Sequence, residues 1–126
     1  MNHRQKTEER RRFRRFGVLG RGFSVVHYDS GEIIGELADI SSGGMAFLSE
    51  PDEFFMPEYS KIDLLQLSDG VLLNSVPVRH VSSTDGYFEI NRQRMKMVRN
   101  SLGFQTLDSD QQKELGKFIR NYARIQ

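Results

Sequence analysis

Apolar and polar residues alternate over short distances along most of the chain, and glycine or small polar residues separate these stretches. Alternation with a period of two is typical of strands that bury one face, and clusters of Gly, Asp, Asn and Ser are typical of turns. The pattern predicts extended segments at 24–28, 33–40, 45–49, 61–67, 71–82, 87–90 and 95–107. Pro77 lies inside one of them and lacks a backbone N–H, so we expect that strand to be at an edge or to carry a bulge there.

The period changes near the C-terminus. Apolar residues now recur at spacings of three and four, at Leu115, Phe118, Ile119, Tyr122 and Ile125. These spacings predict a helix over about 110–124 that packs one apolar face on the strands. Ser109 and Gln112 have the spacing of a capping box, and Asp108 and Asp110 suit the positive end of the helix dipole.

Together these elements predict an all-β fold, an antiparallel β-barrel of about six strands closed by one C-terminal α-helix. The 126 residues are a usual length for one domain, and no internal repeat is visible. Residues 1–9 are polar and charged and contain no apolar residue beyond Met1. We therefore expect a flexible basic arm over 1–9 and a single domain over 10–126.

Composition narrows the class of protein. The chain has no cysteine, which excludes disulfides and thiolate metal sites and favours a cytoplasmic location. No window approaches eighteen consecutive apolar residues, and no signal-peptide core follows the basic N-terminus, so we expect neither a membrane span nor secretion by that route. His3, His27 and His80 lack metal-ligand spacing, and no hydrolase or Walker-type motif occurs. We therefore expect no enzyme activity, no metal and no cofactor.

Charge is distributed unevenly along the chain. Residues 1–15 contain seven Arg or Lys and two Glu, a net charge of +5, whereas the whole chain carries +1 and the remainder therefore −4. A basic arm on a mildly acidic body indicates an anionic partner, such as a nucleic acid, a nucleotide, phosphate or an anionic lipid.

Two short segments are candidates for binding such a partner. The first is the run Glu9-Arg10-Arg11-Arg12-Phe13-Arg14-Arg15-Phe16. A flexible basic tail that supports solubility or contacts nucleic acid loosely would account for the arginines on its own. The two phenylalanines favour a segment that folds back on the barrel, where Phe13 or Phe16 anchors it and holds the arginines in place.

The second segment is Asp39-Ile40-Ser41-Ser42-Gly43-Gly44, which follows a predicted strand. An ordinary β-turn would explain it on its own, with Asp and Ser capping backbone amides and both glycines at positive φ. The two segments together are more specific than either one.

In combination they resemble the PilZ domain family, which has an RxxxR motif near the N-terminus and a D/NxSxxG motif on its barrel. Arg11 and Arg15 match the first motif, and Asp39, Ser41 and Gly44 match the second. The order of the motifs, the late strand and the closing helix are also similar, so the resemblance extends over roughly residues 8–125.

The chain departs from the family pattern at a few positions. Arg10 and Arg14 also satisfy RxxxR, although the preceding sequence favours Arg11 and Arg15. Arg14 stands where the family often has a proline or a small residue. His80 stands where some members have a tryptophan near the ligand, and we interpret it as an ordinary strand histidine.

The resemblance implies a receptor for the bacterial second messenger cyclic di-GMP. An arginine fork can bind guanine O6 and N7 or phosphate oxygens, which explains the repeated arginines Arg11 and Arg15, with Arg10 as a further candidate. Asp39 would accept hydrogen bonds from guanine N1 and N2, Ser41 would add a hydroxyl contact, and Gly44 would let the ligand approach closely.

The same resemblance implies that the arm becomes ordered when the ligand binds and that the new surface is recognised by a downstream protein or by a second copy in a homodimer. The alternative is an RNA- or DNA-binding β-barrel with a basic arm. The acidic body and the lack of an aromatic RNP-like pattern make nucleic acid the weaker candidate. A scaffold of this kind that has lost its ligand remains a third interpretation.

Overall fold

The computed structural model describes residues 14–51 and 56–123. Helix α2 and the π-helical turn η1 follow the strands in the chain. In chain order the elements are β1 (Phe16–Gly17), β2 (Phe23–His27), β3 (Ile33–Ile40), β4 (Gly44–Ser49), β5 (Tyr59–Gln66), β6 (Gly70–Ile90), β7 (Gln93–Phe104), α2 (Ser109–Phe118) and η1 (Ile119–Ala123).

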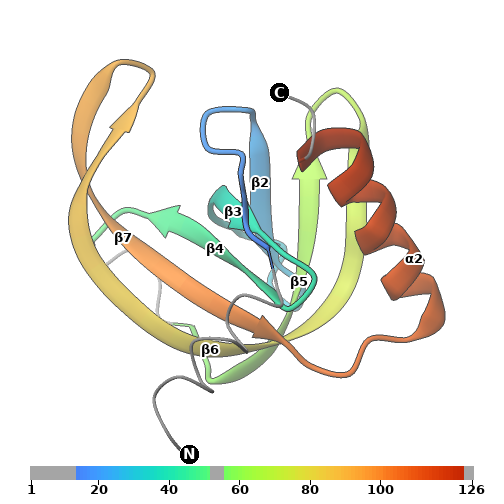
Figure 1. Cartoon of the computed structure of the whole chain (residues 1–126). Coiled ribbons are helices and arrows are strands. Elements are labelled where there is room, and N and C mark those ends of the chain that lie inside the picture. Colours follow the sequence, from blue (N-terminus) through green and yellow to red (C-terminus); the bar gives the residue numbers. More distant parts are fainter. Residues whose placement is uncertain (1–13, 52–55, 124–126) are drawn as a thin grey trace, which may run out of the picture.

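The strands form one antiparallel sheet that closes in a ring. Neighbouring strands pair in the order β3–β2–β5–β6–β7–β4, and β4 pairs back with β3 (Figure 1). This confirms the predicted all-β, six-stranded antiparallel arrangement with one C-terminal helix. The two-residue β1 extends the sheet, because Phe16 lies opposite Ile40 and Gly17 opposite Asp39 on β3.

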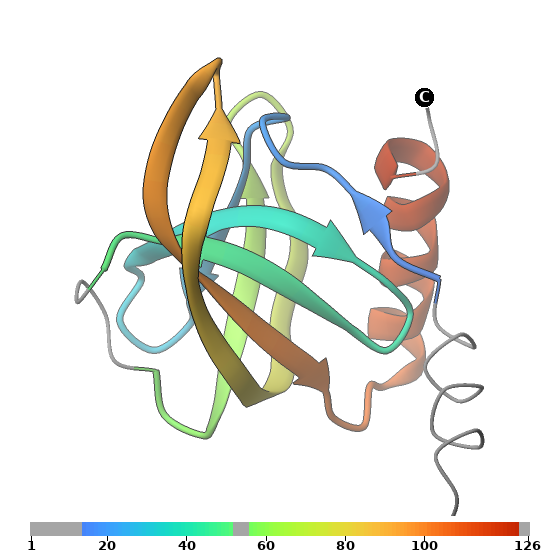
Figure 2. The same cartoon turned by 60° about the vertical axis from the view of Figure 1, so that its left-hand side comes forward.

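The core lies inside this ring. Alternate residues of the strands are fully buried there, among them Phe23, Leu37, Phe47, Ile62 and Val78. Helix α2 covers one side of the ring (Figure 2) with the apolar face that the sequence predicts. Leu115 and Phe118 are buried, and the Phe23 ring meets Phe118 edge to face at 5.0 Å and Tyr122 at 5.5 Å. Ile125 lies outside the described residues.

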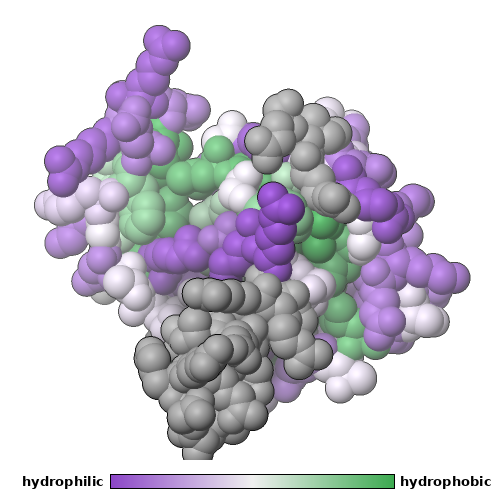
Figure 3. Space-filling model, viewed as in Figure 1, coloured by the Kyte–Doolittle hydropathy of each residue, from purple (hydrophilic) through white to green (hydrophobic). Residues whose placement is uncertain are grey.

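The β6–β7 hairpin projects beyond the ring (Figures 1 and 2). Its tip is hydrophilic, and apolar surface lies below the tip (Figure 3). Near the tip end of β6, Phe88 and Ile90 pack against a small buried cluster that contains Met97. β6 is continuous over Gly70–Ile90, so the predicted break between 71–82 and 87–90 was wrong. The polar residues 83–86 look like a turn in the sequence, but they pair with 97–100 of β7. The reversal comes later, at Asn91 and Arg92, which have φ of 50° and 66°.

Pro77 lies where β7 no longer pairs with β6. The β6–β7 ladder ends at the pair Val78–Phe104, and the Pro77 carbonyl accepts a hydrogen bond from Gln105 N at 2.9 Å. Because N–H and C=O of one strand residue point the same way, the missing N–H of Pro77 falls beyond the end of β7. An irregularity in the β5–β6 pairing between Leu73 and Val76 precedes it. This local edge agrees with the prediction for Pro77.

The predicted helix is present, but its cap was assigned one residue too late. Asp108 is the N-cap, and it exchanges capping-box hydrogen bonds with Gln111 rather than Ser109 with Gln112. Both registers offer a capping residue followed by glutamine. The structure favours the first because Gln111 Nε2 also donates to the Ser75 carbonyl of β6 at 2.9 Å. Among the described helices, none is long and apolar enough to cross a membrane.

Candidate functional site

The outer face of β4 and β7 carries small residues at one end of the strands. Met45 and Leu102 point into the core, so their neighbours Gly44 and Gly103, which lie opposite each other, belong to the outer face. A cavity of about 470 Å³, called the Arg15 cavity below, opens over this face. Its lining residues are Arg15, Ser41, Gly43, Gly44, Val81, Ser101, Leu102 and Gly103.

Gly44 is required by close packing of two backbones. A Cβ atom on Gly44 would lie 2.2 Å from the Leu102 carbonyl oxygen. Gly43 and Gly44 are not among the glycines with positive φ, so the expectation that this turn needs left-handed backbone was wrong. The absence of a side chain at Gly44 lets β4 pack closely against the backbone of β7 at this cavity.

Ser41 holds the turn between β3 and β4. Its side chain is buried, and its Oγ accepts from the N–H groups of Gly43 at 3.1 Å and Gly44 at 3.2 Å. The same hydroxyl lies 3.3 Å from the Gly44 carbonyl, to which it can donate. Ser41 lines the cavity, but in this structure its hydroxyl is engaged by the turn. The capping role that the sequence suggested for this serine is therefore present.

Asp39 joins two arginines at the edge of the cavity. Its Oδ1 accepts from Arg15 Nη1 at 2.9 Å, and its Oδ2 accepts from Arg99 Nη2 at 2.5 Å. The Asp39 side chain is only 14% exposed, whereas that of Arg15 is 55% exposed. Charge-assisted hydrogen bonds of this kind fix the orientation of both guanidinium groups. Arg15 lines the cavity and thereby connects it to an ion-paired group of two cations and one carboxylate.

Arg99 is a residue that sequence reasoning missed. It lies on β7 opposite Leu48, on the same outer face as Ser101 and Gly103. No motif contains it. The alternation of β7, in which Asn100 and Leu102 are buried, could have placed Arg99 on the outer face. Only the closure of the sheet shows that this face lies beside Asp39.

The arm reaches the site through β1. Arg15 pairs with Asp39, whereas the Arg14 guanidinium lies over the Phe16 ring, 5.2 Å from its centroid. Phe16 itself packs against the core, as expected of an anchor. Of the two described arginines that could end the RxxxR motif, Arg15 is therefore the one that contacts Asp39.

Four of the six predicted site residues therefore come together: Arg15, Asp39, Ser41 and Gly44. Arg10 and Arg11 lie outside the described residues, as does the expected flexible arm over 1–9.

His80 belongs to a polar network away from the cavity. Its Nε2 is 2.8 Å from Ser83 Oγ, which donates to Asn100 Oδ1, and Asn100 Nδ2 donates to Ser49 Oγ. A shift in the β6–β7 register between His80 and Ser82 turns Val81 toward the cavity instead. These contacts support the interpretation of His80 as an ordinary strand histidine.

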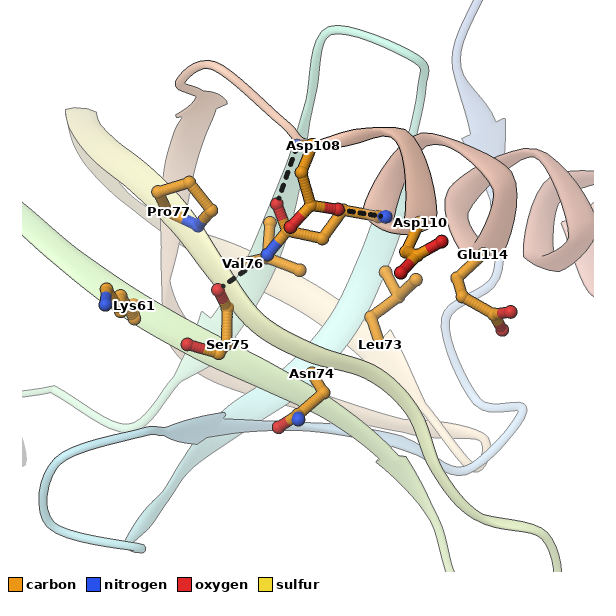
Figure 4. A pocket seen from close by; sticks show the side chains of 10 residues that line it. Lys61, Leu73, Asn74, Ser75, Val76, Pro77, Asp108, Asp110 and Glu114 are labelled. Carbon is orange, nitrogen blue, oxygen red and sulfur yellow. Dashed lines mark hydrogen bonds between the residues drawn. The ribbon is translucent and has the colours of Figure 1, made fainter.

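A separate cavity of about 510 Å³ lies between the start of α2 and strands β5 and β6 (Figure 4). Asp108, Asp110 and Glu114 line it from the helix side, and Lys61 lines it from β5. The hydrogen bond from Gln111 to Ser75 crosses between the two sides. Because three carboxylates and a single lysine line it, this cavity does not suit an anion. It shares no residue with the Arg15 cavity.

The chemistry of the Arg15 cavity is that of binding. Two guanidinium groups can hold phosphates or the acceptor edge of a base, and a floor of glycine and serine admits a flat ring. Among the residues the structure describes, no group of three His, Asp or Glu side chains could hold a metal ion.

Comparisons with known proteins agree on the family and the fold of this chain. A family model described as PilZ domain matches residues 9–121. The PilZ domain of YcgR from Escherichia coli, solved with c-di-GMP, superposes with a TM-score of 0.70 at 20% identity, covering 91% of this chain and 92% of that one. MrkH, described as a c-di-GMP-dependent transcription regulatory factor, gives a TM-score of 0.69 at 19% identity.

The alignment covers 87% of this chain but only 49% of MrkH, so the chain spans about half the length of that relative. A complex of K. pneumonia MrkH with c-di-GMP gives a TM-score of 0.66 at 18% identity, covering 87% of this chain and 51% of that one. No curated protein matches the chain.

Proposed function

The chain belongs to the PilZ domain family, whose model matches residues 9–121, and on this premise we propose that it is a receptor for cyclic di-GMP. The observation that carries the proposal is the ion-paired group of Arg15, Asp39 and Arg99 beside a cavity floored by Gly44 and Gly103. The solved relatives YcgR and MrkH contain or depend on c-di-GMP, which supports the choice of ligand.

The ligand offers groups that match this site. Cyclic di-GMP carries two phosphodiester charges and two guanines, each with the acceptors O6 and N7 on one edge and the donors N1 and N2 on the other. In the proposed complex, Arg11 and Arg15 bind acceptors of the ligand as forks. Asp39 accepts from guanine N1 and N2 through the lone pairs that its two arginine partners leave free, since each carboxylate oxygen accepts only one hydrogen bond from them here.

The arm supplies the second half of the site. Residues 1–15 carry +5, and a ligand with two negative charges neutralises part of this charge when Arg11 and Arg15 close on it. We propose that ligand binding orders the arm over the outer face of β4 and β7. The new surface would be recognised by a protein partner or a second copy of the chain, and the domain catalyses no reaction.

Calorimetric titration of the full chain with cyclic di-GMP at physiological salt tests the proposal. We expect saturable binding with a defined ratio of one or two ligands per chain. Arg15→Ala is the matched control and should reduce the affinity strongly. Absence of both binding heat and ligand-induced thermal stabilisation would refute the function.

Titration with a single-stranded oligonucleotide distinguishes the cyclic di-GMP receptor from the main alternative, an RNA- or DNA-binding protein. If the chain binds nucleic acid, the affinity should fall steeply with salt concentration, because each neutralised phosphate releases counterions. Tight binding of the oligonucleotide without binding of cyclic di-GMP would favour the nucleic-acid interpretation.

A further inference from the structure

An open groove lies next to the Arg15 cavity, which is the proposed ligand cavity. It has a volume of about 550 Å³ and is formed by the β3–β4 turn, the segment after β7 and one face of α2. Its apolar lining comes from Phe104, Leu107, Leu115 and Ile119, with Gly43 and Gly116 leaving it open. An open apolar groove of this size on a small domain favours an apolar occupant.

The groove and the ligand cavity meet at the β3–β4 turn. Gly43 lines both of them, the cavity together with Gly44 and the groove together with Ser42. The turn is rigid because Ser41 Oγ accepts from the N–H groups of Gly43 and Gly44. An element that fills the groove therefore contacts the same turn as the ligand.

The arm enters at this turn. Phe16 pairs with Ile40, so continuing the antiparallel register places Arg15 opposite Ser41 and Arg14 opposite Ser42. β1 also contacts η1, which follows α2, and it runs beside the helix in Figure 2. This register sets Arg14, the first residue that the structure describes, beside Ser42 in the lining of the groove, so the residue that precedes Arg14 is within reach of the groove.

Phe13 is the apolar residue available to fill it. From Asn2 to Arg12 the arm contains no apolar side chain, so Phe13 is isolated among charged neighbours. Burying a phenylalanine side chain removes a large apolar area from water, which is a strong driving force for docking.

The spacing of the motif suits two contacts at once. On one helical turn, residues four apart lie on the same face, whereas a residue two positions away lies on the opposite face. In the ligand-bound arm, a helical turn over 11–15, in place of the non-helical backbone that Arg14 and Arg15 have here, would therefore direct Arg11 and Arg15 to one side and Phe13 to the other. The ligand cavity and the groove both border the β3–β4 turn, where Gly43 lines each of them, so contacts from two faces of one turn of the arm could reach both.

We propose that this groove is the docking site of Phe13 of the same chain, and that docking holds the arm in place while its arginines bind the ligand. The inference rests on the proposed cyclic di-GMP function. It assigns to α2 and the segment after β7 a part in ligand binding, although neither belongs to the ion-paired group of Arg15, Asp39 and Arg99.

Affinity measurements on four variants test the docking. Phe13→Ser should weaken binding of cyclic di-GMP roughly ten- to hundredfold, the factor expected for exposing a buried phenylalanine. Phe13→Leu should retain most of the affinity. Gly116→Met fills the groove from α2 and should weaken binding similarly, whereas Gly116→Ala should not. Alanine and methionine are better helix formers than glycine, so both Gly116 variants should fold.

Cross-linking reports the position of the arm directly, because the chain has no cysteine of its own. In the double variant Arg12→Cys and Gln112→Cys, oxidation should form an intramolecular disulfide several-fold faster with cyclic di-GMP than without it, since bridging requires Cα atoms within about 7 Å. Adding Phe13→Ser should remove the acceleration. The control pair Arg12→Cys and Asp110→Cys reports on the other cavity and should show none.

The outcomes separate the two proposals. If the parent chain does not bind cyclic di-GMP, both proposals fail. If the parent binds but Phe13→Ser binds as tightly and the cross-link shows no dependence on the ligand, the docking is overturned and the receptor function stands. A disulfide between two chains would place a second copy in the groove and would overturn docking within one chain.

Discussion

At the scale of single residues, Asp39 connects the two halves of the site. It binds Arg15 from the arm and Arg99 from β7. The motif could be recognised in the sequence, since Asp39, Ser41 and Gly44 stand at fixed spacing. Their division of labour could not, because whether Ser41 caps the turn or contacts a ligand depends on hydrogen bonds that only the folded turn reveals.

The first prediction concerns Arg15→Ala. A bidentate arginine contact is worth about 1–3 kcal/mol, so the variant should bind cyclic di-GMP roughly ten- to two-hundredfold more weakly. The Arg15 side chain is more than half exposed, and exposed ion pairs contribute little to folding, so the melting temperature without ligand should stay near that of the parent. Calorimetry and thermal unfolding with and without ligand measure both effects. Unchanged affinity would remove Arg15 from the site.

Gly44 and Gly103 form a matched pair for the second prediction. Gly44→Ala forces a Cβ toward the Leu102 carbonyl oxygen and should lower the free energy of unfolding by about 1–3 kcal/mol, the usual cost of overpacking. In Gly103→Ala the nearest atom, Val81 Cγ2, is 3.6 Å from the new Cβ, an ordinary contact. That variant should fold like the parent and lose affinity only if ligand lies against β7. Equal stability of the two variants in urea would contradict the close-packing explanation for Gly44.

At the scale of elements, the periodicity of the sequence predicted most strands and the helix, and its errors have local causes. Residues 83–86 are polar because they belong to a hairpin exposed to solvent, and exposure gives a strand the composition of a turn. The predicted N-cap was wrong by one residue because Asp108 with Gln111 and Ser109 with Gln112 have the same capping-box spacing. The contact between Gln111 and Ser75 favours the first pair. Tertiary contacts of this kind leave no trace in local composition.

The third prediction tests the cap that the structure assigns. Asp108→Ala removes the acceptor for Gln111 N and should reduce stability by about 1 kcal/mol, a fall in melting temperature of roughly 3–6 °C for a domain of this size. Asp110→Ala is the control, because Asp110 lies in the first turn without capping it and should cost a few tenths of a kcal/mol through the helix dipole. Ser109→Ala should also be mild. If Ser109→Ala were the most damaging of the three, the cap predicted from the sequence would be right after all.

At the scale of the whole molecule, the site is assembled from segments far apart in the sequence. Arg15, the β3–β4 turn, Val81 and Arg99 meet because the sheet closes in a ring. The sequence could predict a barrel from its many short strands, yet it could not predict which outer face meets Asp39. The C-terminal segment η1 likewise meets a distant segment, the β5–β6 loop, where Tyr122 Oη donates to Asp69 Oδ2 at 2.8 Å.

The last prediction follows from that contact. The hydrogen bond to the Asp69 carboxylate, together with desolvation and the negative charge of Asp69, raises the pKa of Tyr122 above the ordinary 10.0. The protonated phenol is therefore favoured in the folded state. The stabilisation from this contact is complete below pH 10, the pKa in the unfolded chain, and is lost as the pH rises through the higher pKa of the folded state.

Phenolate absorbance measures this directly, because the chain has four tyrosines and no tryptophan. One tyrosine of the folded protein should ionise later than the ordinary pKa predicts, and Tyr122→Phe should remove that late step. Asp69→Asn should move the step to lower pH, since the neutral amide removes the charge that opposes ionisation of Tyr122. A titration unchanged by Asp69→Asn would show that the C-terminal segment is not joined to the β5–β6 loop in solution.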